Sequence, residues 1–85
     1  MDFPQYRKRF DDKSFYKVTS FTTFEEIQLV GKRFFMHSVH AKKYFEKLYI
    51  QDMLASEIPR LPAGREMFQM STEEEFETIF KESNL

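Results

Sequence analysis

The sequence predicts an α+β domain, a small mixed sheet of three or four strands with helices packed mainly on one face. Short segments alternate apolar and polar residues as strands do, and longer segments have helical propensity. A strand-then-helix pattern also occurs twice, because residues 16–27 match residues 68–79 when the two are aligned. Each copy reads as an aromatic strand, a hydroxyl cap and a helix with a Phe-x-x-Ile stripe. The expected element order is therefore β-β-α-β-α-β-α.

The composition is typical of a folded chain. Of 85 residues, 41% are hydrophobic, 18% aromatic and 32% charged, and there is no cysteine. This length suits a single domain over residues 1–85 whose core is dense in large side chains. Residues 1–4 and 83–85 are expected to be frayed. No apolar run is long enough for a signal peptide or a membrane span, so we expect a cytoplasmic protein that binds no membrane.

The first half of the chain predicts a hairpin, a helix and a strand. Residues 5–10 and 14–19 form the hairpin, with an Asp-Asp-Lys turn between them. Thr19 or Ser20 then caps a helix that ends at Gly31, where a left-handed residue suits the helix terminus. Residues 32–41 predict a strand with apolar groups on both faces, which favours a central position in the sheet.

The second half predicts a helix, a loop, a short strand and a last helix. Residues 42–55 have helical propensity, and residues 56–65 form a Pro/Gly loop that includes a PxxP spacing. A strand over 66–70 leads into a helix opened by a capping box of Ser71 and Glu74. The acidic run Glu73–Glu75 suits the positive end of this helix dipole and needs no bound cation to explain it.

Apolar residues cover most of the circumference of the helix at 42–55. One ridge serves the core, and a second ridge needs its own cover, because so short a chain has little protein to bury both. The second ridge, a predicted self-association surface, comprises Tyr44, Ile50 and Leu54. The alternative, equally open, is that the N-terminal arm or the Pro/Gly loop covers it.

Charge is distributed unevenly along the chain. Residues 1–50 hold ten Lys/Arg and six Asp/Glu, a net charge of +4, whereas residues 51–85 hold three and eight, a net charge of −5. Basic and aromatic residues on one face could meet phosphates and stack on bases. The residues of this possible nucleic-acid face are Arg7, Lys8, Arg9, Lys32, Arg33 and Phe35. The alternative is that the aromatic residues fill the core and the basic residues face solvent.

No residue pattern points to catalysis. His37 and His40 would point to opposite faces of a strand, so we expect no shared metal site. The chain has no phosphate-binding loop, nucleophile elbow or zinc-protease motif, and we expect no cofactor. The sequence therefore favours a non-catalytic protein–protein interaction module that forms a homodimer. Nucleic-acid binding through the basic and aromatic face is the alternative.

Overall fold

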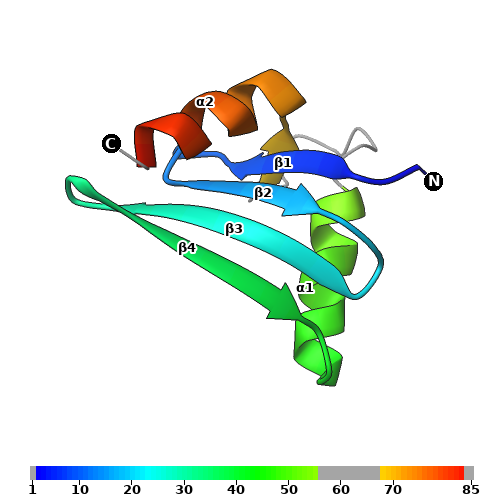
Figure 1. The fold of residues 1–85 in the computed structure, drawn as a ribbon. Helices are drawn as coiled ribbons and strands as arrows, with labels where there is room; N and C mark the ends of the chain where they lie inside the picture. The colour runs from blue at the N-terminus through cyan, green and yellow to red at the C-terminus, as the bar shows by residue number, and fades with distance from the viewer. Residues whose placement is uncertain (1, 56–67, 84–85) are drawn as a thin grey trace.

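The computed structural model describes residues 2–55 and 68–83 (Figure 1). Strands and helices follow one another as β1 (Gln5–Arg9), β2 (Ser14–Val18), β3 (Thr23–Val30), β4 (Arg33–His40), α1 (Tyr44–Ala55), β5 (Phe68–Met70) and α2 (Glu73–Ser83). This arrangement confirms the predicted α+β class. The predicted loop at 56–65 lies outside the described residues.

The strands form one antiparallel sheet in the order β4-β3-β2-β1-β5. The predicted hairpin between residues 5 and 19 is confirmed, with Arg7 opposite Tyr16. The predicted mixed sheet of three or four strands is wrong, because five strands pair and every pair is antiparallel. Three hairpin connections join the first four strands, so their pairing needs no crossover.

The two helices lie on opposite faces of the sheet, which corrects the prediction that they share one face (Figure 1). Tyr16 and Val18 on β2 pack with Ile50 and Met53 of α1. Phe15, between those strand residues, instead packs with the helix α2. Successive side chains on a strand point to opposite faces. An almost fully buried β2 therefore needs cover on both faces, and each helix supplies one.

Residues 19–31 form a turn and a strand rather than the predicted helix. The Thr19 amide donates to the Thr23 carbonyl at 3.0 Å, which closes the turn between β2 and β3. The hydroxyls of Thr19 and Ser20 each lie 2.6 Å from the Thr23 hydroxyl. They therefore bond across a hairpin turn instead of capping a helix. Phe24 and Ile27 are both buried but on opposite faces, as the odd spacing between them requires in a strand.

Gly31 serves the β3–β4 hairpin rather than a helix terminus. Its φ is +64°, and it forms with Lys32 the two-residue connection between the paired residues Val30 and Arg33. A tight hairpin and a helix C-terminus both require a left-handed residue. The predicted left-handed conformation of Gly31 is therefore confirmed, whereas the predicted helix terminus at this residue is wrong.

The helices α1 and α2 occur where the sequence predicts them, and each has a side-chain cap. The Glu46 carboxylate accepts a hydrogen bond from the Lys43 amide at 3.1 Å, at the start of α1. At α2 the capping residue is Thr72, whose hydroxyl accepts from the Glu75 amide at 3.1 Å. The predicted box of Ser71 and Glu74 is therefore displaced by one residue.

Phe3 packs against the core on the α1 side, although the sequence predicts a frayed segment there. Its ring meets that of Phe21 edge-on, with the centroids 5.0 Å apart. At the other end, Ser83 is the last residue of α2 and its hydroxyl donates to the Phe80 carbonyl at 2.7 Å.

Candidate functional site

β4 is an edge strand, which corrects its predicted central position. Its eight residues pair with β3 along their whole length, and no other described strand pairs with its outer side. Figure 1 shows it running along the outside of the sheet. The opposite edge is β5, which has only three residues in the described part of the chain. Long open edges invite pairing with another chain, and very short ones do not.

The register identifies which backbone groups of β4 face outward. The Ala41 amide donates to the Thr22 carbonyl at 2.6 Å, just beyond the β3–β4 ladder. Hydrogen-bonded pairs alternate along an antiparallel ladder, so the odd-numbered residues of β4 bond to β3. The amides and carbonyls that point away from the sheet therefore belong to Phe34, Met36, Ser38 and His40. They present alternating donors and acceptors along the outer edge.

The side chains of β4 expose apolar surface on both faces of this edge. Phe35 is 45% exposed on the face covered elsewhere by α1, and Met36 is 44% exposed on the α2 face. Val39 and Phe34 pack partly against the two core clusters and anchor the strand. A strand added beside β4 would therefore find an apolar neighbour on either face.

Positive charge lies at both ends of β4. Lys32 and Arg33 precede or begin the strand, and Lys42 and Lys43 follow it. Between residues 27 and 45 the chain contains no Asp or Glu. Among residues 2–55 and 68–83, none of these four cations is in an ion pair. The open edge of the sheet is therefore basic at both ends.

The basic residues of β1 do not join this surface. Lys8 points to the α2 face, where its ammonium bonds Asp12 at 3.1 Å and Glu75 at 3.2 Å. Those two contacts raise the pKa of Lys8. Arg7 and Arg9 point to the α1 face. Their strand, β1, is the third strand from β4 in the sheet, so the two strands lie roughly 14 Å apart. The predicted nucleic-acid face is thus split, and only Lys32, Arg33 and Phe35 remain together.

Arg7 is a structural residue, only 1% exposed. Its Nε donates to the Met53 carbonyl at 2.9 Å, and its Nη1 donates to the Tyr6 carbonyl at 2.8 Å. Met53 lies in the last turn of α1, which has no basic residue of its own. The guanidinium therefore satisfies a terminal carbonyl and complements the negative end of the helix.

Tyr16 and Tyr49 form a second polar contact between the sheet and α1. Their hydroxyl oxygens lie 2.8 Å apart, and both rings pack with Phe68. Burial raises the pKa of Tyr16, and its hydrogen bond with Tyr49 raises this pKa further. Burial also raises the pKa of Tyr49. Both phenols are therefore held in the protonated form, which suits a structural contact and not a nucleophile.

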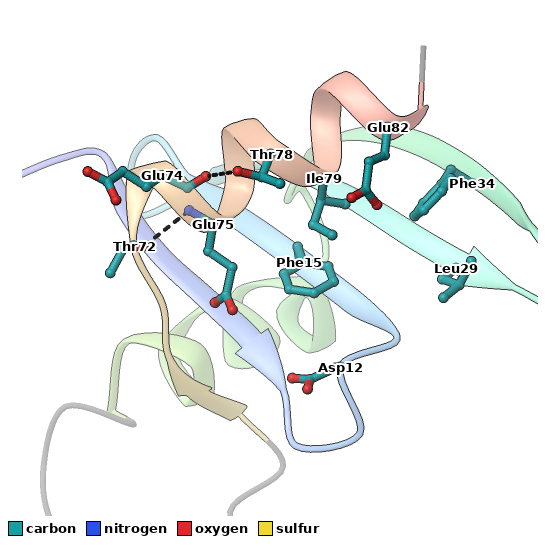
Figure 2. Close-up of a pocket in the computed structure, with 10 residues that line it drawn as sticks. All are labelled: Asp12, Phe15, Leu29, Phe34, Thr72, Glu74, Glu75, Thr78, Ile79 and Glu82. Atoms are coloured by element: carbon teal, nitrogen blue, oxygen red, sulfur yellow. Dashed lines mark hydrogen bonds between the residues drawn. The ribbon is translucent and has the colours of Figure 1, made fainter. Parts of the chain in front are cut away.

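A hollow of about 430 Å³ lies at the start of β4, lined by Lys32, Arg33, Phe34, Phe35, Glu82 and Ser83. A larger one, about 590 Å³, lies between α2 and the sheet (Figure 2). Its floor is apolar, with Phe15 and Ile79 facing each other, and carboxylates lie around it. Two of these, Asp12 and Glu75, already bond Lys8. The larger hollow therefore lies where α2 packs against the sheet, whereas the smaller one lies next to the open edge.

The predicted self-association ridge is divided, because two of its three residues are buried in the core. Ile50 is 0% exposed and Leu54 is 7% exposed, both within the α1-side core, whereas Tyr44 is 71% exposed. The sheet covers Ile50 and Leu54, because α1 packs against large side chains of β2, β3 and β5. Tyr44 and its neighbour Phe45, with ring centroids 6.1 Å apart, remain exposed at the start of α1.

His37 and His40 lie on β4 and point to opposite faces, as the sequence predicts. Across the ladder, His37 is opposite Glu26 and His40 is opposite Thr23. In the described part of the chain, no three His, Asp or Glu residues are grouped so as to hold a metal ion. None of its helices is long and apolar enough to cross a membrane.

The open edge at β4 is the surface that sequence reasoning missed. Apolar residues on both faces of a segment suggested burial in the middle of a sheet. The opposing signal was the absence of carboxylates between four Lys/Arg residues, because charge at strand ends is typical of edges.

No protein-family model, curated protein or solved structure matches this chain.

Proposed function

We propose that this chain is a non-catalytic protein–protein interaction module that binds an extended polypeptide segment along the open edge of β4. The observation that carries the proposal is an eight-residue edge strand with no neighbour on its outer side in the described structure. Its outward amides and carbonyls alternate in the order that another strand requires. Strand addition of this kind uses main-chain hydrogen bonds for affinity and side-chain contacts for selectivity.

The side chains of β4 support binding on both faces of the incoming strand. Phe35 and Met36 are each nearly half exposed, and they point to opposite faces. Neighbouring side chains on paired strands contribute roughly 0.2–1 kcal/mol each. An added strand therefore gains apolar contacts in addition to its backbone bonds.

The test uses a panel of capped octapeptides matched to the length of β4, with neutral, acidic and basic versions of a Thr/Val sequence. Residue-resolved amide hydrogen exchange reports where a peptide binds. We expect slower exchange at Phe34, Met36, Ser38 and His40, whose amides point outward. If no peptide of the panel slows exchange at these amides, the proposal is wrong.

A matched pair of proline variants separates edge pairing from general destabilisation. Ser38→Pro removes an outward amide, which the β3 ladder does not use, and prolines are tolerated in this position on edge strands. It should abolish peptide binding and leave the fold intact. His37→Pro removes an amide bonded to β3, and should lower the free energy of unfolding by about 1–3 kcal/mol.

A second measurement leaves the protein unchanged. The bound peptide is N-methylated at alternate residues, either on the side that faces β4 or on the opposite side. Methylation on the facing side should prevent binding, whereas methylation on the other side should be tolerated. Equal binding by both methylated peptides would contradict strand addition.

A further inference from the structure

We infer that the segment bound by β4 is acidic, with carboxylates near both of its ends. This inference rests on the proposed function and names the chemistry of the partner. Lys32 and Arg33 lie at one end of the edge, and Lys42 and Lys43 at the other. None of them pairs with a carboxylate within residues 2–55 and 68–83. A strand of eight residues spans roughly 26 Å, so its two ends would lie beside these two pairs of cations.

Four carboxylates, those of Glu25, Glu26, Glu46 and Glu82, belong to the elements next to β4 or line the hollow at its start. Glu25 and Glu26 lie on β3, where Glu25 is also opposite Lys17 of β2 and Glu26 is also opposite Tyr16. Glu46 caps α1 through the Lys43 amide. Glu82 lines the hollow at the start of β4 together with Lys32 and Arg33. It offsets part of the charge at that end, so the Lys42–Lys43 end should contribute more to recognition.

A second copy of the chain fits this edge poorly. If two β4 strands paired antiparallel through their outward backbone groups, with Met36 of each opposite Ser38 of the other, Lys32 of each copy would lie opposite Lys42 of the other. Like charges placed opposite each other on neighbouring strands are destabilising. Basic strand ends therefore oppose self-pairing and favour an acidic partner. Electrostatic complementarity of this kind speeds association and selects among partners.

A nucleic acid fits less well than a polypeptide. The outer edge of β4 presents carbonyls as well as amides, at Phe34, Met36, Ser38 and His40. A phosphate accepts hydrogen bonds but has no donor for these carbonyls. A polypeptide strand satisfies both kinds of group.

The test compares the acidic, neutral and basic octapeptides by titration calorimetry at low and high salt. At about 0.05 M salt we expect the acidic peptide to bind about tenfold more tightly than the neutral one, and the basic one to bind most weakly. At about 0.5 M salt the advantage should shrink severalfold, because the contacts are exposed to solvent. Equal affinity of the three peptides would overturn the acidic partner while leaving strand addition standing. Binding by none of them would overturn strand addition as well.

Charge variants locate the effect. Lys42→Gln with Lys43→Gln should remove most of the acidic peptide's advantage and leave the affinity for the neutral peptide unchanged. The matched control is Lys13→Gln with Lys17→Gln, which removes the same charge from β2 and the turn before it. If the control reduces the advantage equally, the effect arises from net charge and the inference is wrong.

Two further arms address the other occupants. A single-stranded oligouridine that binds more tightly than the acidic peptide and slows exchange at the same amides would overturn the inference in favour of nucleic acid. Sedimentation of the chain alone over a wide concentration range examines the second copy. A dimer that is lost in Ser38→Pro would show that β4 pairs with itself and would also overturn the inference.

Discussion

Arg7 supplies the positive charge that the last turn of α1 lacks in its own sequence. A basic residue on a short N-terminal strand suggests a surface for anions, yet this guanidinium is buried and bonded to two carbonyls. Lys8, its neighbour, bonds carboxylates on the other face. Alternation along a strand thus assigns adjacent cations to different structural tasks. At the scale of the residue, charge on β1 stabilises the fold.

The phenols of Tyr16 and Tyr49 should make the free energy of unfolding fall at alkaline pH. Burial raises the pKa of both groups above the unfolded value of about 10, so the folded chain holds these protons more tightly than the unfolded chain. Their contribution is fully present below about pH 10 and is lost as the pH rises further. We expect the free energy of unfolding, measured in urea, to fall steeply above that pH.

Tyr16→Phe separates this effect from others of the same sign. Hydrogen bonds to Asp12 and Glu75 raise the pKa of Lys8, which also lowers stability at alkaline pH. Tyr16→Phe should lower the free energy of unfolding by about 1 kcal/mol at neutral pH, because the Tyr49 hydroxyl loses its hydrogen bond to Tyr16. The variant should also show a smaller fall in this free energy at alkaline pH. Tyr44→Phe, at an exposed position, is the matched control. An unchanged alkaline profile in Tyr16→Phe would contradict this account.

Among the helices and strands, one sequence pattern occurs in two different structures, because hydroxyl residues serve both hairpin turns and helix caps. Residues 19–27 and 71–79 are alike in sequence, yet the first forms a turn and the strand β3, and the second forms the cap and first turns of α2. Phe21, Thr22 and Thr23 favour extended backbone, whereas Glu73–Glu75 favour the first turn of a helix. The difference between the two copies, rather than their similarity, therefore indicated the structure.

Gly31 allows a direct test of the β3–β4 hairpin. Its φ of +64° lies in the left-handed region, and a Cβ added there would meet nothing within 4 Å. Gly31→Ala should therefore cost only backbone energy, about 1–2 kcal/mol of unfolding free energy in urea. Gly31→Asn should cost less, because asparagine tolerates this conformation better. A neutral or stabilising Gly31→Ala would show that the hairpin does not need this turn.

At the scale of the whole molecule, the sheet separates two apolar clusters. Ile50, Met53 and Leu54 join β2 and β3 on one face, and Phe76 joins Phe15 on the other. The covered area ends before β4, whose residues are mostly exposed. Within residues 2–55 and 68–83, the helices α1 and α2 bury the middle of the five-stranded sheet and leave its long edge, β4, open. This incomplete cover produces the proposed interaction surface.

Leu54→Glu distinguishes a core position from a dimer surface. A self-association ridge predicts that the variant separates two copies and stays folded. Because Leu54 is 7% exposed in the α1-side core, the structure instead predicts that the free energy of unfolding falls by about 4 kcal/mol or more and that the chain unfolds. Circular dichroism and urea unfolding measure this. Phe45→Glu, 81% exposed on the same helix, should change stability by about 0.5 kcal/mol or less. A folded Leu54→Glu would restore the ridge as a surface.

The local structure of most segments follows from the order of the amino acids: the first hairpin, the strand at 32–41, the helices α1 and α2, and the α+β class to which they belong. Those features depend on neighbours along the chain, such as alternation, capping groups and turn residues. Three features were not predictable in this way: β4 lies at the edge, the helices lie on opposite faces, and Ile50 and Leu54 are buried. These outcomes depend on which strands pair, and an apolar side chain looks the same in the sequence whether a distant element covers it or not. The basic residues separated in the same way, because strand order and alternation left only those next to β4 on the open edge.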